Sequence, residues 1–201
     1  MKRALWALMA FLSVSVAIWS WRLVFVDGML EQDGWQHHLF RHPLATYAHF
    51  GLGPLALLVG SFQFLDGLRK KWPHVHRVIG WIYIVSCMLA GVGALPLAIN
   101  SAAGPIAAVG FGLLAAAWLY STTSVFWAAQ ARRFDRHRIW MIRSYALTFA
   151  GVTLRLYLTV FAGVLGFDFS MVYMAAAWAC WVINLIVAEL FIIARLQPIN
   201  T

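Results

Sequence analysis

Apolar residues in this sequence gather into six long runs that are separated by shorter polar segments. A run of about 20 apolar residues is long enough to cross the hydrocarbon layer of a membrane as a single α-helix. The pattern therefore predicts six membrane-spanning helices. We place them at 5–25, 44–65, 78–99, 106–129, 139–165 and 171–194.

The composition also favours a membrane protein over a soluble one. The chain has 201 residues, of which 63% are hydrophobic and only 11% are charged, whereas a soluble domain carries roughly 25% charged residues. Cys87 and Cys180 fall within predicted spans and show no spacing typical of a disulfide or a metal site. We therefore predict an all-α integral membrane protein, a six-helix bundle that forms a single transmembrane domain.

The basic residues are concentrated on one side of the predicted membrane. The net charge is +8, and most Lys and Arg residues fall in segments that we place on that side, whereas the other side has four acidic residues, Asp27, Glu31, Asp33 and Asp168. This asymmetry is the positive-inside bias that orients helices during insertion. It predicts a multi-pass protein of the bacterial inner membrane, embedded in the lipid bilayer, with both termini in the cytoplasm. Because the charge reports topology, it does not imply a nucleic-acid partner. The basic residues on the inner side are Lys2, Arg3, Arg69, Lys70, Lys71, Arg77, Arg132, Arg133, Arg136, Arg138, Arg143 and Arg195.

Two of the predicted hairpins look like copies of each other. His76-Arg77 and His137-Arg138 each close a basic loop, and each pair precedes an Ala-Gly-Val triplet, at 90–92 and 150–152. Internal repeats of this kind are common in membrane proteins, although so short a match also arises by chance. We predict that spans two to five form a four-helix core built from these two hairpins.

Small and polar residues line one face of three predicted helices, at about 100° of rotation per residue. One explanation is close helix packing, because small residues let two backbones approach. The other is an enclosed polar site or cofactor, because polar groups within a membrane normally face the bundle interior. The stripes comprise His137, Met141, Ser144, Thr148, Gly151 and Arg155 in span five, His76, Gly80, Tyr83, Cys87, Ala90 and Ala94 in span three, and His49, Gly53, Ala56, Gly60, Gln63 and Gly67 in span two.

Two histidines on these stripes have the chemistry of haem ligands. His76 and His137 enter spans three and five from the same side and at matching depth. Two neutral imidazoles on facing helices can bind the iron of a b-type haem axially, and Arg77 and Arg138 could then contact the haem propionates. The arrangement resembles the four-helix membrane cytochromes b of the ascorbate- and ferric-reductase type, which carry two haems. This chain departs from them because His49 has no histidine partner on span four, so at most one haem is predicted. The alternative for His76 and His137 is a hydrogen bond to loop carbonyls or lipid phosphate.

A second set of polar residues suggests a polar or substrate site that a small molecule or ion could pass. The set consists of His49, Gln63, Tyr83 and Arg155, and ionisable residues inside a membrane are functional candidates by default. Arg155 could instead extend outward to Asp168. A transporter is therefore an alternative function for the chain.

Other charged and imidazole residues have simpler explanations. Arg143 in span five and Glu189 in span six lie at about the same depth, which predicts a structural ion pair. His37, His38 and His42 could contact a metal ion if helical, but no cysteine or fourth ligand accompanies them. We therefore predict a solvated loop there and no metal site.

No motif of a soluble enzyme occurs in the sequence: it has no glycine-rich nucleotide loop, no HExxH and no nucleophile elbow. Whether the protein is an enzyme stays open. A further alternative is a non-enzymatic membrane subunit or scaffold, whose stripes serve packing and whose loops bind a membrane partner subunit.

Several short motifs resemble a known family. They are His49, Gly60-x-x-Gln63-Phe64, His76-Arg77-x-x-Gly80-x-x-Tyr83, Arg136-His137-Arg138-x-Trp140-Met141-x-Arg143-Ser144-Tyr145, and Thr153-Leu154-Arg155. Over residues 44 to 160 the chain is similar to a bacterial family of uncharacterised predicted membrane proteins, domain of unknown function two-three-zero-six. The resemblance implies a multi-pass membrane protein and supplies no activity. Our leading hypothesis from the residues is a membrane redox protein associated with a b-type haem or a quinone.

Overall fold

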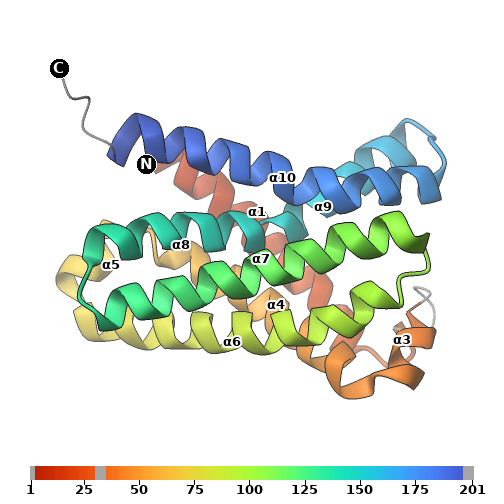
Figure 1. The fold of residues 1–201 in the computed structure, drawn as a ribbon, viewed down its shortest axis with the longest axis horizontal. Helices are drawn as coiled ribbons and strands as arrows, with labels where there is room; N and C mark the ends of the chain where they lie inside the picture. The colour runs from red at the N-terminus through yellow and green to blue at the C-terminus, as the bar shows by residue number, and fades with distance from the viewer. Residues whose placement is uncertain (1–2, 30–34, 197–201) are drawn as a thin grey trace. The chain divides into compact units, whose positions relative to one another are not determined.

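The computed structural model describes residues 3–29 and 35–196. Every regular element in this part of the chain is a helix (Figure 1). The elements are α1 (Arg3–Phe25), α3 (Gln36–Arg41), α4 (Pro43–Phe62), α5 (Asp66–Lys71), α6 (Pro73–Ile99), α7 (Gly104–Gln130), α8 (Phe134–Thr148), α9 (Ala150–Tyr157), the π-helix η1 (Leu158–Val164) and α10 (Phe169–Leu196).

Six helical stretches of the described chain are long and apolar enough to cross a membrane. They confirm the all-α, multi-pass class that the six apolar runs predicted. Two of them begin five residues earlier than predicted, α6 at Pro73 rather than at residue 78 and α8 at Phe134 rather than at residue 139. Their first turns are rich in basic residues and histidine, so the apolar pattern alone leaves these turns out. The stretches are Ala4–Phe25, Pro43–Phe62, Pro73–Ile99, Gly104–Gln130, Phe134–Val164 and Phe169–Ala194.

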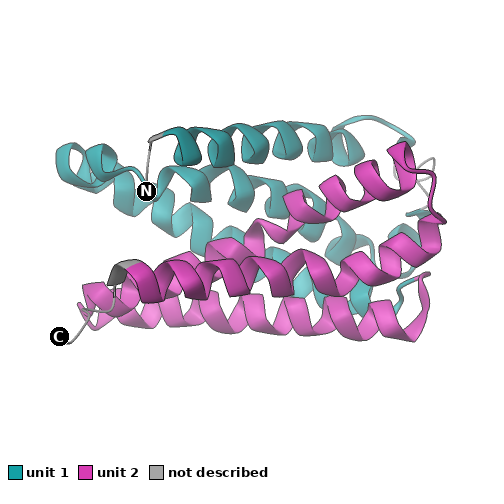
Figure 2. Cartoon of the chain, turned by 90° about the horizontal axis from the view of Figure 1, so that it is seen from above, with its two compact units in different colours: residues 1–101 teal, residues 102–201 magenta. Residues whose placement is uncertain are grey.

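The chain divides into two compact units, unit 1 (Met1–Ser101) and unit 2 (Ala102–Thr201) (Figure 2). The division falls in the turn between α6 and α7, so each predicted hairpin lies within one unit. In unit 1 the α4–α6 hairpin is joined by α1, and in unit 2 the α7–α8 hairpin is joined by α10.

Unit 1 is organised around α4, which packs against both α1 and α6. Two indoles of α1 donate hydrogen bonds to backbone carbonyls of α4, Trp6 Nε1 to Ser61 O and Trp21 Nε1 to Gly51 O, both at 2.9 Å. The contact between α4 and α6 is close at Gly93, where an added Cβ would lie 2.7 Å from the Ala45 carbonyl oxygen. A small residue outside the predicted stripes, Gly93, therefore permits the close approach of α4 and α6.

A short segment covers one end of unit 1. It consists of α3 with the flanking Trp35 and His42, and we call these residues, 35–42, the cap. Trp35 and Leu39 pack against a buried apolar cluster formed by Leu23, Phe50 and Leu97. Because these three residues come from α1, α4 and α6, the cap contacts the ends of all three spans of its unit.

Unit 2 is organised around α10, which packs against α7, α8 and α9. Trp178 Nε1 donates to the Ile106 carbonyl at 3.0 Å, and an added Cβ on Gly110 would lie 2.9 Å from the same Trp178 nitrogen. Asn184 donates to the Ala146 carbonyl and accepts from the Thr153 hydroxyl, both at 3.1 Å. A single amide side chain thus links α10 to α8 and α9.

The fifth span is not one uniform helix. It consists of α8, α9 and η1, and α8 is separated from α9 by Phe149. The Thr148 hydroxyl donates to the Ser144 carbonyl at 2.9 Å, a back-bond that often bends helices. The sequence predicted a single uninterrupted span, because its apolar pattern continues across the bend.

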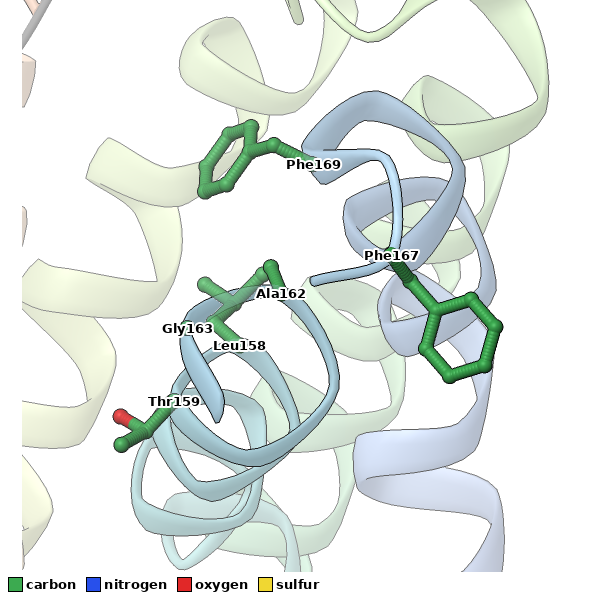
Figure 3. A pocket seen from close by; sticks show the side chains of 6 residues that line it. All are labelled: Leu158, Thr159, Ala162, Gly163, Phe167 and Phe169. Atoms are coloured by element: carbon green, nitrogen blue, oxygen red, sulfur yellow. The ribbon is translucent and has the colours of Figure 1, made fainter. Parts of the chain in front are cut away.

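A shallow hollow of about 410 Å³ lies where η1 turns into α10 (Figure 3). Its walls are apolar apart from one threonine, and the Phe167 ring points away from the other lining residues (Figure 3). None of the residues predicted to form a site lines this hollow. The lining residues are Leu158, Thr159, Ala162, Gly163, Phe167 and Phe169.

Candidate functional site

His137 is held in a defined orientation within unit 2. It is the fourth residue of α8, its side chain is half-buried, and its Nδ1 atom lies 3.1 Å from the Val125 carbonyl oxygen of α7. A carbonyl only accepts hydrogen bonds, so Nδ1 carries the proton and donates. In the neutral ring, Nε2 then keeps its lone pair for a ligand. Metal-binding histidines are typically oriented by such a bond from the other ring nitrogen.

His76 occupies the corresponding place in unit 1. It is also the fourth residue of its helix, α6, and it is also half-buried. The Gln63 side chain donates to the His76 carbonyl at 3.4 Å and lies against Gly80, where an added Cβ would be 3.6 Å from Gln63 Oε1. Gln63 therefore links the last turn of α4 to the first turns of α6.

Arg77 and Arg138 follow these two histidines in sequence, and both are exposed. Each arginine thus follows a candidate ligand in the sequence, and its side chain is accessible to an anionic group. Arginine suits carboxylates because its planar fork can form two parallel hydrogen bonds with one of them.

His49 is oriented in the same way as His137. Its Nδ1 atom lies 3.1 Å from the Ala90 carbonyl oxygen of α6, and its ring contacts Phe50 edge-on. Gln63 lies 14 residues further along α4, which corresponds to about 21 Å of helical rise. These two members of the predicted polar set therefore lie at opposite ends of unit 1.

The other two members of that set belong to different units. Tyr83 is fully buried within α6 of unit 1. Arg155 belongs to α9 of unit 2, where its Nη1 donates to the Gly151 carbonyl at 2.8 Å. Asp168, considered above as a partner of Arg155, accepts a hydrogen bond from the Met171 backbone N–H at 2.9 Å. Because His49 and Gln63 lie at opposite ends of α4, these two do not share one compact site.

Arg143 and Glu189 form a two-pronged ion pair between α8 and α10. Arg143 Nε lies 2.6 Å from Glu189 Oε1, and Nη2 lies 2.9 Å from Oε2. The guanidinium also lies over the Trp140 ring, 4.7 Å from its centroid. Each charge thus has a direct partner within the span, as a charge in hydrocarbon requires.

Further polar residues of the span-five stripe make contacts between α7 and α8. The Trp118 indole donates to the Thr148 hydroxyl at 2.9 Å, and the Thr122 and Ser144 hydroxyls lie 2.9 Å apart. These side chains satisfy one another, so the packing explanation accounts for this part of the stripe.

The cap contains a histidine cluster that sequence reasoning missed. His38 is only 2% exposed, so the prediction of a solvated loop is wrong for it. Its ring stacks on Trp35 at a centroid distance of 5.5 Å, and the His37 ring lies 3.8 Å away. Trp35, His38 and Leu39 have the i, i+3, i+4 spacing of a buried helix face, and this was the available signal.

Burial lowers the pKa of His38 to about 4, and the neighbouring His37, His42 and His49 lower it further. The ring is therefore neutral at pH 7. Two buried ring nitrogens, His38 Nδ1 and His37 Nε2, have no hydrogen-bond partner among the described residues. No group of three or more His, Cys, Asp or Glu residues in the described chain is arranged to hold a metal ion.

The cap is tied to α6 through Asn100. Its amide nitrogen lies 3.1 Å from His42 Nε2 and 2.8 Å from the Pro96 carbonyl, and Arg41 donates to its amide oxygen at 3.2 Å. An amide nitrogen only donates, so His42 Nε2 is the acceptor.

The family model described as predicted membrane protein (DUF2306) matches residues 46–192. The chain belongs to this family. The membership predicted from the short motifs is confirmed, and the DUF2306 match extends past residue 160 to include most of α10.

The DUF2306 region contains His49, His76, His137 and the Arg143–Glu189 pair, whereas His37, His38 and His42 precede it. No curated protein and no solved structure matches the chain. Family membership therefore establishes an integral multi-pass membrane protein, and any activity must be argued from the residues themselves.

Proposed function

We propose that this DUF2306 protein is a membrane redox protein that would hold one b-type haem, with His76 and His137 as the candidate iron ligands. A haem bound there would carry single electrons through its Fe(II)/Fe(III) couple. The observation that carries the proposal is the hydrogen bond from His137 Nδ1 to the Val125 carbonyl at 3.1 Å. It selects the tautomer whose Nε2 can bind iron.

His76 supports the proposal by its position. It stands at the same place in its helix as His137 does, and Gln63 joins its backbone to the end of α4. Each histidine is followed by an exposed arginine, Arg77 or Arg138, which would supply positive charge to a propionate. The chain thus offers two imidazoles and two guanidinium groups in two similar settings.

The visible absorption spectrum of the purified protein tests this proposal. We expect a Soret band, as purified or after addition of haem, with sharpened bands at longer wavelength after dithionite. His76→Leu and His137→Leu should each lose most of it, because either change removes one axial ligand. His137→Met should retain haem with a shifted spectrum, since a thioether can replace the imidazole.

His74→Leu is the matched control, because His74 is exposed and lies in the first turn of the same helix as His76. It should bind haem like the unchanged protein. Absence of a Soret band even after haem addition would overturn the proposal, as would a spectrum that survives His137→Leu unaltered.

A further inference from the structure

The cap of unit 1 is built around a buried histidine, His38, that acid would convert into a buried positive charge. Residues 35–42 contain three histidines and Arg41, and His49 of α4 acts electrostatically on the buried His38. On the α1 side, Arg22 donates a hydrogen bond to Met29, which packs against the same apolar cluster as the cap. On the α6 side the contacting group is the uncharged Asn100.

Two contacts of the cap depend on neutral imidazoles. His38 is buried against Trp35 and His37, and neither His38 Nδ1 nor His37 Nε2 has a partner among the described residues that could stabilise an added proton. His42 Nε2 accepts the hydrogen bond from Asn100, and a protonated ring would present a donor to a donor. Protonation therefore weakens both the packing of α3 and its link to α6.

We propose that the cap is an acid-released strap, which packs on the end of unit 1 at neutral pH and separates from it when the buried His38 ring becomes protonated. Release would uncover the apolar cluster of Leu23, Phe50 and Leu97 and the neighbouring His49. This inference concerns a different group of residues from the proposed haem ligands and does not depend on them.

The direction of the pH effect follows from the buried imidazole. Packing lowers the pKa of His38 from 6.5 to about 4, so the packed cap favours the neutral ring. Its stability is fully present above about pH 6.5 and is lost as the pH falls toward 4. Because solvent screens part of this effect, we expect the packed-to-released ratio to fall about tenfold between pH 7.5 and pH 5.

Hydrogen exchange of the backbone amides tests the strap, measured by mass spectrometry on peptides that cover residues 36–42. The exchange rate of the unfolded chain is measured at each pH, because amide exchange itself depends on pH and protection is the ratio of the two rates. The protection of α3 should fall about tenfold from pH 7.5 to pH 5, while the protection of mid-span peptides from α6 and α7 stays constant.

His38→Gln and His38→Phe remove the titrating ring, one with a polar and one with an apolar replacement. At least one should keep the cap protected at pH 7.5, and this variant should lose most of the pH dependence. His74→Phe, at an exposed position outside the cap, should behave like the unchanged protein. Constant protection of α3 down to pH 5 would overturn the proposal. It would also fail if both His38 variants kept the full pH dependence.

Discussion

Charged residues inside the spans are tolerated because direct partners satisfy them. Arg143 and Glu189 illustrate this, since both carboxylate oxygens of Glu189 accept a hydrogen bond from the guanidinium. Removing one partner leaves the other charge in an apolar layer, whereas removing both leaves two apolar side chains in contact. Either residue is therefore expected to stabilise the protein only when the other is also present.

A double-mutant cycle measures the coupling free energy between Arg143 and Glu189. Arg143→Leu and Glu189→Leu should each destabilise the protein by about 2 kcal/mol or more, and the double variant should recover most of the loss. Thermal unfolding in detergent gives the comparison, with Arg138→Leu as an exposed control on the same helix. If the destabilisation of the double variant equalled the sum of the two single destabilisations, the two residues would not be coupled.

Two helices in each unit approach closely at a position occupied by glycine, Gly93 in unit 1 and Gly110 in unit 2. At Gly93 the nearest atom to an added Cβ is a backbone oxygen of α4, which cannot rotate away as a side chain can. At Gly112 of α7, an added Cβ would meet nothing within 4 Å. Glycine is thus required for packing at Gly93 and not at Gly112.

Alanine at these two positions should give opposite results. Gly93→Ala should lower the stability by about 1–3 kcal/mol, because α4 and α6 must move apart. Gly112→Ala should leave it unchanged or raise it by about 0.5–1 kcal/mol, because alanine is the better helix former. Unfolding of both variants in parallel gives the comparison. Equal stability of the two variants would rule out close packing at Gly93.

The elements were largely predictable, and their irregularities were not. The spans follow from long apolar runs, but the apolar pattern does not mark the break at Phe149. Near this break, Trp118 of α7 donates to Thr148 and Asn184 of α10 donates to the Ala146 carbonyl, and only the folded unit creates these bonds. The burial of His38 was also not predicted, because it comes from contacts of the cap with spans that are distant in the sequence. The orientation of His137 was equally hidden, since it depends on a backbone carbonyl of another helix.

At the scale of the whole molecule, two three-span units place basic residues at corresponding turns. Unit 1 has them in α5 and at the start of α6, and unit 2 has them in the turn before α8 and in its first turn. The opposite ends of the units carry the cap and the turn from η1 to α10. If the positive-inside rule applies, both basic turns lie on the cytoplasmic side.

Cysteine labelling of each end of each unit tests this orientation. Phe40 and Phe167 are exposed at the ends opposite to the basic turns, whereas Lys70 and Arg133 are exposed in them. The native Cys87 and Cys180 are buried and should react little. In cells with an intact membrane around the protein, a membrane-impermeant maleimide should label Phe40→Cys and Phe167→Cys. Lys70→Cys and Arg133→Cys should react only after that membrane is opened. Labelling in the reverse pattern would show that the basic turns lie outside the cell. If Phe40→Cys and Phe167→Cys, or Lys70→Cys and Arg133→Cys, reacted from different sides, an odd number of spans would separate the two residues of that pair.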